Sequence, residues 1–309
     1  MSDPIARPSL AGVFTRSDAL KLGHSDQELQ RWVGQRTVRR LRRGVFGSGQ
    51  EPEYADQRLV ERGRGLAMHH GGNIAISHHA ALAFHGIALH AVPLGVLHAV
   101  RLGGAPRSGS QLVIARPRRP PPTVEVHGVL VVKPEVAIVQ VACAFGFVAG
   151  LVAADSALHR DKATAQSLCE EIERTGAMPG IAAAREMSKR CREGAESPGE
   201  TLLRLAIEQA GFDVELQCPV GESGREPFAF ADMRIAGTRS LWEFDGAVKY
   251  EGAEGKQALV AEKVREDRIR DLGWGLQRVI WRDLGAPDRL QKRIRVEAER
   301  LRIPSKLCP

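Results

Sequence analysis

The segment Ala231–Tyr250, ADMRIAGTRSLWEFDGAVKY, carries the strongest structural signal in this chain of 309 residues. It contains the end of a short apolar run, Phe228–Ile235, then a glycine, and then the alternating segment Leu241–Asp245. Short apolar runs on either side of a glycine are typical of two strands joined by a turn. The sequence therefore predicts a β-hairpin over these residues.

The predicted hairpin carries three carboxylates. Because side chains alternate along a strand, Glu243 and Asp245 share one face of the second strand. If Asp232 on the first strand faces them, their repulsion costs on the order of several kcal/mol unless a divalent cation or protons compensate it. Hard oxygen ligands suit Mg²⁺ or Mn²⁺. The pattern thus predicts a site for one of these ions.

A wider pattern surrounds these acids. A predicted helix before the hairpin carries Glu200, and the residue Lys249 follows the Glu243-x-Asp245 strand. Together with Asp232, this pattern resembles the metal-binding core of the restriction-endonuclease-like (PD-(D/E)xK) superfamily. The stretch E-F-D-G-A-V-K-Y, the later A-E-K-V-R-E-D-R-I-R-D-L-G-W and a strand ending in V-I-W are similar to the very-short-patch-repair-related nuclease-like domains that end many actinobacterial proteins.

The resemblance implies a Mg²⁺-dependent endonuclease site. The superfamily has a lysine two residues after the glutamate, where this chain has Asp245. The site therefore either takes its ammonium group from Lys249 or Lys263 or is inactive. The implied metal ligands are Asp232, Glu243, Asp245 and Glu200, and the implied catalytic residues are Asp232, Glu243, Asp245, Lys249 and Lys263.

Two of these residues also have a purely structural explanation. Ser197 and Glu200 form the S-x-x-E pattern of a capping box, in which the glutamate needs to do no more than cap a helix. Lys263 lies in a highly charged helix predicted over Gln257–Leu272, where ion pairs alone can explain it. The predicted pairs of this helix are Lys263 with Asp267 and Glu266 with Arg270.

Near the N-terminus, the sequence predicts two short helices separated by a tight turn. The first is expected within residues 13–22 with Thr15 or Ser17 as N-cap, and Ser25 with Glu28 forms a capping box at the start of the second. A helix, a turn and a helix form an arrangement that reads DNA. The strand pair T-V-R-R-L-R-R-G-V-F follows like the wing of a winged helix, and its run R-L-R-R-G-V-F resembles the N-terminal domain of AbiEi-type antitoxins.

The candidate DNA-binding residues lie on the second helix and on the arginine-rich strands. A run of charges can simply be a solvated face. Here the arginines cluster beside the helix-turn-helix pattern rather than among acids, which favours contact with phosphates. The candidates are Gln27, Gln30, Arg31, Arg36, Arg39, Arg40, Arg42 and Arg43.

The middle of the chain predicts an α+β module, and its S-H-H-A-A-L-A-F-H-G segment resembles the middle of the same actinobacterial proteins. Two apolar helices are favoured there over one membrane span, because Gly146 and Gly150 interrupt the apolar run. The nearby histidine pairs do not favour zinc, because adjacent histidines on a helix cannot both face one ion. The expected elements are helices Tyr54–Met68, Glu135–Ala144 and Val148–His159, a helix capped by Ser77 that ends at Gly86, and strands Val96–Leu102, Gln111–Ala115 and Val124–Val132.

These patterns predict a chain of α/β and α+β domains. The expected domains are a winged helix-turn-helix over residues 1–50, an AbiEi-antitoxin-like α+β module over 51–192, and a restriction-endonuclease-like α/β domain over 193–309. The net charge of +7 favours a polyanionic partner. The five cysteines lack metal or disulfide spacing and suit a reducing cytoplasm.

We therefore expect a DNA-binding protein with a Mg²⁺-dependent, endonuclease-like C-terminal domain. The alternative is an AbiEi-type transcriptional repressor of a toxin-antitoxin system whose nuclease-like domain is inactive. An RNA-processing nuclease would share the metal site, but with only 5% aromatic residues the sequence offers no evident stacking platform for bases. The expected partner is DNA, with a homodimer or a cognate toxin left open and no membrane.

Overall fold

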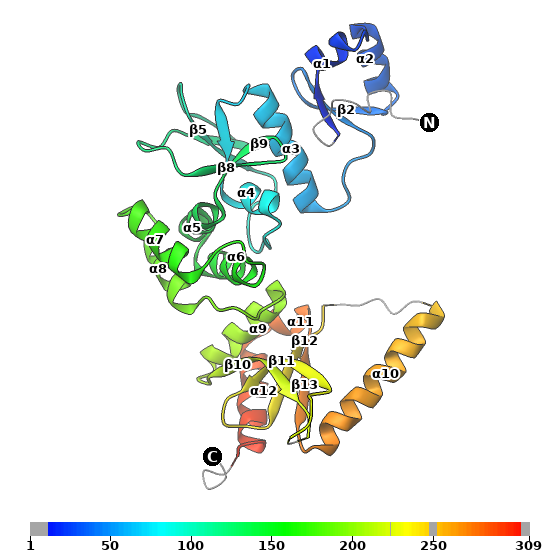
Figure 1. Ribbon diagram of the computed structural model, residues 1–309, viewed down its shortest axis with the longest axis vertical. Coiled ribbons are helices and arrows are strands. Elements are labelled where there is room, and N and C mark those ends of the chain that lie inside the picture. Colours follow the sequence, from blue (N-terminus) through cyan, green and yellow to red (C-terminus); the bar gives the residue numbers. More distant parts are fainter. Residues whose placement is uncertain (1–11, 223, 247–251, 304–309) are drawn as a thin grey trace. The chain divides into compact units, whose positions relative to one another are not determined.

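The computed structural model describes residues 12–222, 224–246 and 252–303, with side chains described from residue 260 onward in the last range. Within these residues the chain is a mixed α/β protein with three sheets and 12 helices (Figure 1). The contacts between residues divide it into two compact units, Met1–Cys191 and Arg192–Pro309. Each unit is described by itself.

The first unit begins with a three-stranded antiparallel sheet in the order β1-β3-β2. Thr15 is confirmed as the N-cap of the first helix, and the residues before the helix, Val13–Thr15, pair with β3 as a strand. The capping box of Ser25 and Glu28 is confirmed. Phe14 and Phe46 stack in the core of this part. Its elements are β1 (Val13–Thr15), α1 (Arg16–Lys21), α2 (Asp26–Gly34), β2 (Val38–Arg42) and β3 (Val45–Ser48).

The rest of the first unit is a six-stranded mixed sheet with six helices, among the described residues. Its sheet order is β6-β7-β5-β4-β9-β8. The elements are α3 (Ala55–His69), β4 (Ile74–Ile76), α4 (His78–His85), β5 (Leu97–Arg101), β6 (Arg107–Gly109), β7 (Leu112–Ala115), β8 (Thr123–Val126), β9 (Val129–Val132), α5 (Pro134–Phe145), α6 (Phe147–His159), α7 (Ala165–Thr175) and α8 (Ile181–Arg190).

In this part of the first unit, the structure contradicts one prediction from the sequence and confirms another. The single strand predicted over Val124–Val132 is wrong, because His127 and Gly128 both have positive φ, 50° and 76°, and turn the chain into the β8–β9 hairpin. The two apolar helices are confirmed as α5 and α6, which are separated at Gly146 with φ of 95°. No helix in the described part of the chain is both long and apolar enough to cross a bilayer.

The second unit is built on a four-stranded sheet in the order β10-β11-β12-β13. The first three strands are antiparallel, and α10 then crosses to place β13 parallel to β12. The predicted hairpin is confirmed, with Met233 opposite Trp242 and a turn at Gly237. The elements are α9 (Pro198–Gln209), β10 (Val214–Val220), β11 (Ala229–Ile235), β12 (Ser240–Phe244), α10 (Gly252–Asp271), β13 (Gly275–Val279), α11 (Trp281–Leu284) and α12 (Pro287–Arg300).

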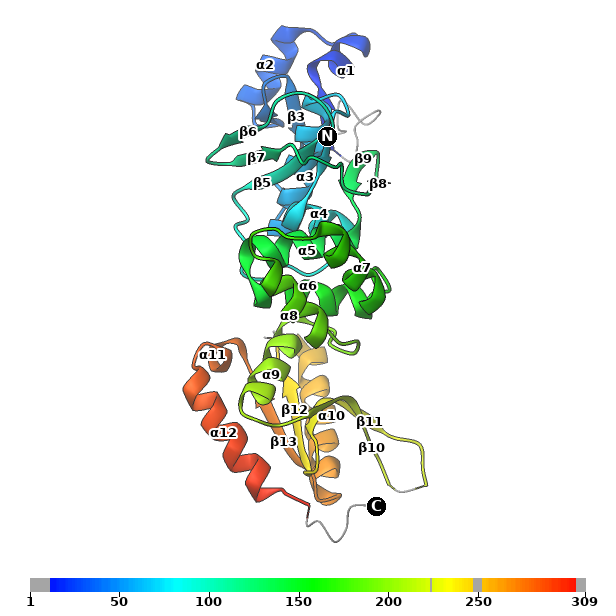
Figure 2. The same cartoon turned by 90° about the vertical axis from the view of Figure 1, so that its left-hand side faces the viewer.

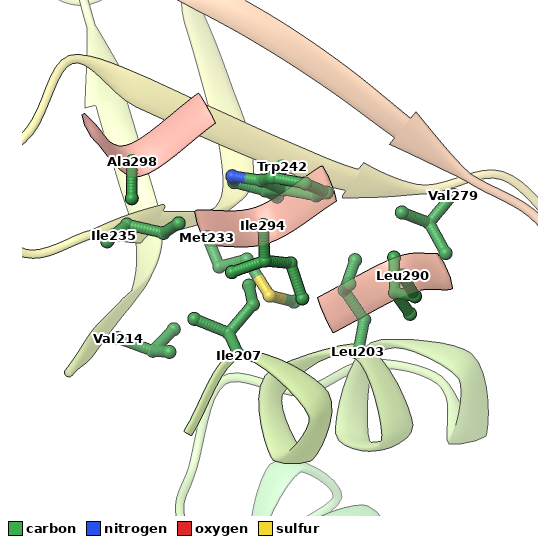
Figure 3. Packing of buried hydrophobic residues seen from close by; sticks show 10 residues of the cluster. All are labelled: Leu203, Ile207, Val214, Met233, Ile235, Trp242, Val279, Leu290, Ile294 and Ala298. Atoms are coloured by element: carbon green, nitrogen blue, oxygen red, sulfur yellow. The ribbon is translucent and has the colours of Figure 1, made fainter. Parts of the chain in front are cut away.

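Helices cover both faces of this sheet (Figure 2). On one face, α9 and α12 pack Leu203, Ile207 and Ile294 against Met233 and Trp242 (Figure 3). On the other face, Ile269 of α10 packs in a second buried cluster with strand residues. Because the side chain of Glu243 points opposite to that of Trp242, it lies on the face that α10 covers.

Candidate functional site

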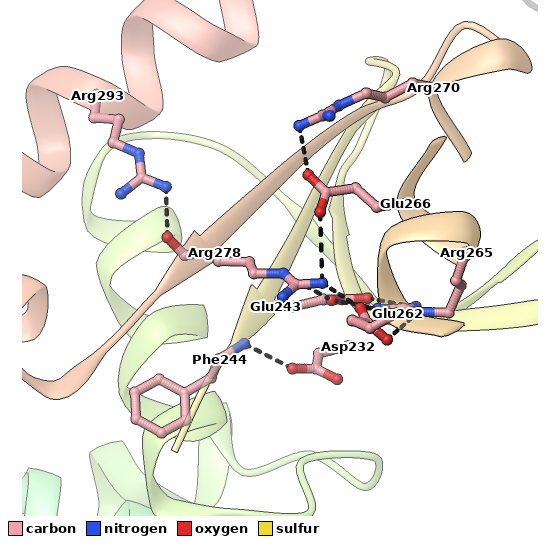
Figure 4. Close-up of polar contacts among 9 residues, drawn as sticks. All are labelled: Asp232, Glu243, Phe244, Glu262, Arg265, Glu266, Arg270, Arg278 and Arg293. Carbon is pink, nitrogen blue, oxygen red and sulfur yellow. Dashed lines mark hydrogen bonds and ion pairs between the residues drawn. The ribbon is translucent and has the colours of Figure 1, made fainter. Parts of the chain in front are cut away.

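Asp232 lies where the hydrogen-bonded pairing of the hairpin ends. The paired positions reach Met233 and Trp242, and beyond them the Phe244 N–H donates to Asp232 Oδ2 at 2.8 Å (Figure 4). A carboxylate side chain therefore takes over from the backbone of β11 as the partner of β12. This bond fixes Asp232 at the open end of the hairpin.

The surroundings of Asp232 are acidic. The pKa of Asp232 is raised to about 7: burial is the largest cause, the nearby carboxylates of Glu200, Glu243 and Glu196 also raise it, and the Phe244 N–H opposes them. Three residues that the sequence analysis selected, Glu200, Asp232 and Glu243, are thus close enough for their charges to interact. The net effect is a cluster of negative charge that disfavours ionisation of Asp232.

Glu243 is matched by a cation that the sequence analysis missed. Arg265 of α10 donates from Nη1 to Glu243 Oε1 at 3.0 Å and from Nη2 to Oε2 at 2.8 Å, in a bidentate pair (Figure 4). The side chain of Glu243 is only 13% exposed, so the pair is well shielded from water. Arg265 also donates to Glu262, which lies one turn earlier on the same helix.

A second arginine joins this network from β13. Parallel pairing sets Arg278 opposite Glu243, and its guanidinium forms an ion pair with Glu262 and lies 3.8 Å from Glu266. The predicted pair of Glu266 with Arg270 is confirmed. Glu262 and Arg265 are three residues apart on α10, so the pair between them could be predicted from the sequence alone. The contacts of both arginines with Glu243 depend on how α10 and β13 pack against β12.

Glu200 acts visibly as a helix cap. Its backbone N–H donates to Ser197 Oγ at 3.2 Å, and its carboxylate accepts from the Ser197 hydroxyl and from the Glu196 N–H, both at 2.8 Å. In a strict capping box, the N–H that donates to the carboxylate belongs to the N-cap residue, here Ser197. In this chain it belongs to Glu196. Glu200 is 8% exposed, and it adds its charge to the acidic surroundings of Asp232.

The remaining candidates lie at the edge of this cluster. The Asp245 N–H donates to the Val279 carbonyl at 2.8 Å, which extends the pairing of β12 with β13, and its side chain is half-buried. Lys249 lies outside the described residues. Lys263 lines a pocket of about 440 Å³ together with Glu262 and Glu266, so it stands beside the charge network on α10.

The donor set fits a divalent cation only in part. In residues 12–222, 224–246 and 252–303, no three Asp, Glu, His or Cys side chains form a group that could hold a metal ion. Mg²⁺, however, is commonly held by one or two carboxylates together with substrate phosphates. Asp232, whose Oδ2 is already engaged, and Glu243 can supply that number of ligands. A cation at Glu243 has to compete with Arg265.

The candidate DNA-binding residues near the N-terminus differ in exposure. Half-buried Arg39 donates to Glu61 Oε2 at 2.9 Å and to the carbonyl groups of Gly49 and Gln50, so it ties β2 to α3 and to the loop between β3 and α3. Arg42 is also half-buried. The exposed candidates are Gln27, Gln30 and Arg31 on α2, and Arg36, Arg40 and Arg43 around β2.

Arg42 belongs to a cluster of like charges. It lines a pocket of about 320 Å³ with Arg62 of α3 and Arg107 of β6. Burial lowers the pKa of Arg42, and the positive charges of Arg62 and Arg107 lower it further. Such crowding of guanidinium groups is relieved by an anion. The sequence offered no signal for Arg62 and Arg107, because they reach Arg42 only through the packing of α3 and the β6–β7 hairpin.

In comparisons with known proteins, no protein-family model and no curated protein matched the chain.

Proposed function

We propose that the chain is a DNA-binding protein whose second unit hydrolyses phosphodiester bonds with the help of Mg²⁺ or Mn²⁺. The observation that carries the proposal is the position of Asp232 at the end of the hairpin, within charge range of Glu200 and Glu243. Active sites are where such clusters of like charge are tolerated, because a substrate or a cation compensates them.

The order of elements supports a restriction-endonuclease-like fold for the second unit. The resemblance requires a helix with Glu200, a hairpin with Asp232 and Glu243 on its two strands, and then a charged helix. The elements α9, β11, β12 and α10 have this order, and α9 packs on the sheet that carries the hairpin. Fold likeness alone does not establish activity, so the chemistry has to come from the residues.

The residues can meet two needs of phosphodiester hydrolysis. A bound Mg²⁺ or Mn²⁺ supplies an activated water and offsets the negative charge of the transition state. Asp232 and Glu243 would hold it, with Asp245 and Glu200 at the edge of the site. The chain has Asp245 at the position of the superfamily's lysine and therefore lacks a positive charge there. Arg265 provides a positive charge next to Glu243. We therefore add Arg265 to Lys249 and Lys263 as a source of that charge.

The second candidate function is a transcriptional repressor with an inactive nuclease-like unit, as the AbiEi resemblance implies. One observation favours it. Both carboxylate oxygens of Glu243 accept from Arg265, and a guanidinium that stays there occupies a ligand position permanently. A homodimer, a cognate toxin and a cytoplasmic location stay predictions of the sequence analysis.

Cleavage of supercoiled plasmid separates the two candidates. We expect the full chain to nick plasmid with Mg²⁺ and not with EDTA. We expect Glu243→Gln to slow nicking at least about 100-fold, because the variant loses a carboxylate ligand of the metal ion that offsets the transition-state charge. Glu215→Gln is the matched control, since Glu215 is also a sheet carboxylate paired with an arginine, Arg234, but on β10. It should nick like the wild type.

Replacement of Arg265 distinguishes its two roles. If Arg265 supplies positive charge to the phosphate, Arg265→Met slows nicking by a protein that is active as wild type. If Arg265 only blocks Glu243, the wild type is inactive and Arg265→Met restores nicking with Mg²⁺. If neither the wild type nor this variant nicks the plasmid, the nuclease proposal is wrong and transcriptional repression is the candidate function that stays.

DNA binding by the first unit is tested by its salt dependence. We propose a winged helix-turn-helix in which α2 presents Gln27, Gln30 and Arg31, and β2 with its turn presents arginines to phosphates. Joint replacement of Arg40, Arg42 and Arg43 by Ala should reduce the slope of log Kd against log salt by about 2 to 3, since each phosphate contact contributes about 0.9. The measurement is fluorescence anisotropy with a labelled duplex.

Arg39→Ala is the control for that experiment. Because Arg39 is committed to Glu61, its loss should leave the salt slope unchanged. It should lower the stability of the first unit instead, by about 1 kcal/mol, since the pair is partly exposed. A slope that falls as much with Arg39→Ala as with the triple variant contradicts this assignment.

A further inference from the structure

The first unit contains a cavity that the proposed function does not use. It has a volume of about 630 Å³ and lies between α5, α7 and the connection from β7 to β8. Pockets for drug-sized molecules measure roughly 300–1,000 Å³ and are lined mainly by apolar side chains with a few polar groups. This cavity has that character, because Val136 and Val139 of α5, Val100 of β5 and Met178 contribute apolar surface.

Gln140 and His78 provide polar groups in this apolar setting. Gln140 is the single polar residue that interrupts the apolar run of residues 136–154, and it lines the cavity. Its Oε1 accepts a hydrogen bond from the His78 N–H at 3.1 Å. This bond orients the side-chain amide and leaves its N–H groups as donors.

His78 is held in an unusual conformation. Its φ is 54°, in the left-handed region that residues other than glycine rarely adopt. Backbone strain of this kind is concentrated at binding and active sites. The ring stacks on His98 with centroids 4.6 Å apart, and Nδ1 lies 3.0 Å from Ser77 Oγ. Burial, together with His98 and His79, lowers the pKa of His78 to about 3, so the ring is neutral at physiological pH.

The charged groups around the cavity leave it positive. Glu171 is the acid of the lining, and Arg174 cancels it through a pair in which Nε donates to Oε2 at 2.6 Å. Two further arginines, Arg118 and Arg119, line the cavity from the exposed proline-rich loop between β7 and β8. An apolar interior with two cations at its edge suits a ligand that is apolar at one end and anionic at the other.

We propose that this cavity binds a small amphipathic anion, an aromatic or branched aliphatic molecule with one carboxylate or sulfonate group. The apolar body lies against Val136, Val139 and Met178. The anionic group meets Arg118 and Arg119, and Gln140 with the uncharged His78 ring provides hydrogen bonds between them. The site is independent of the nuclease proposal, since every residue named belongs to the first unit.

Two fluorescent probes with related aromatic bodies test the proposal. Anilinonaphthalene sulfonate carries an anionic group, and phenylnaphthylamine does not. We expect the folded full chain to bind both probes and Met178→Trp, which fills the cavity from its exposed edge, to weaken both about tenfold or more. Joint replacement of Arg118 and Arg119 by Ala should weaken the sulfonate about tenfold or more, because charge-assisted bonds are lost, and should leave the uncharged probe within about twofold.

Arg116→Ala is the matched control, because Arg116 lies on the same loop but does not line the cavity. It should bind both probes like the wild type, and thermal melts of all variants report whether the fold is retained. The proposal is overturned if Arg116→Ala weakens the sulfonate as much as the double variant does. It is also overturned if a folded Met178→Trp variant still binds both probes with unchanged affinity, which means that they bind elsewhere.

Discussion

Asp232→Asn is expected to abolish Mg²⁺-dependent nicking and, at the same time, to stabilise the second unit above pH 7. The asparagine keeps an oxygen that accepts from the Phe244 N–H, so the hairpin end is retained. It removes a carboxylate whose ionisation the surroundings oppose. Loss of function combined with a gain in stability is typical of residues that are kept for activity.

The pH dependence of this gain follows from the raised pKa of Asp232. Below its ordinary pKa of 3.8, the carboxyl is protonated in both the folded and the unfolded chain, so it has no effect. As the pH rises to about 7, the unfolded chain ionises first and the folded unit loses stability. Above pH 7 the full penalty is present. After allowance for the partial exposure of Asp232, we expect Asp232→Asn to raise the free energy of unfolding of the second unit by about 2 kcal/mol at pH 8 and to leave it unchanged at pH 4.

The tryptophans make this measurable in the full chain. Trp32 lies in the first unit, and the other three of the four tryptophans lie in the second. In a Trp32→Phe background, urea unfolding followed by tryptophan fluorescence therefore reports on the second unit alone. A stability difference between the Asp232→Asn variant and its parent that is the same at every pH contradicts the account. So does a variant that is less stable than its parent at pH 8.

Trp242→Ala is expected to destabilise the second unit by about 4 kcal/mol, because a large aromatic side chain leaves a cavity in the core. Trp242 is 0% exposed, packs in one core cluster with residues of α9 and α12 (Figure 3), and donates from Nε1 to Ser240 Oγ at 2.9 Å. Because Trp242 directly precedes Glu243 on β12, its loss also loosens the candidate site.

Hydrogen exchange with mass spectrometry measures this effect in each unit separately. Peptides from the second unit should lose protection, and peptides from the first unit should keep it, since Trp242 contributes to a core within the second unit. Val296→Ala on α12 is the control, because Val296 is 56% exposed and its loss should change stability by less than about 0.5 kcal/mol. Equal loss of protection in both units would show that the two do not unfold independently.

Local sequence patterns predicted local structure well in this chain. The capping box at Ser25, the helix start at Ser197 and the hairpin around Gly237 are confirmed. Each of these signals involves residues that are close in sequence and needs no information about packing. The strand predicted over Val124–Val132 is wrong because the two-residue turn at His127 and Gly128 was not recognised in the apolar run, although both residue types tolerate a positive φ.

The site was predictable in its acids and not in its cations. Asp232 and Glu243 were found because they lie on the two strands of one hairpin. Arg265 and Arg278 reach Glu243 through the crossing of α10 and the parallel pairing of β13. The sequence likewise predicted that Arg39 contacts DNA. Its partner in the structure is Glu61, which lies on a helix that only the tertiary fold brings near. Long-range ion pairs leave no periodic pattern to detect.

The central claim is that Asp232 and Glu243 together form a divalent-cation site. Isothermal titration calorimetry of the full chain with Mn²⁺ tests it most directly. The account predicts measurable binding by the wild type and by Glu215→Gln, and binding at least about tenfold weaker in both Asp232→Asn and Glu243→Gln, since each removes one of two carboxylate ligands. Identical isotherms for all four proteins would contradict it.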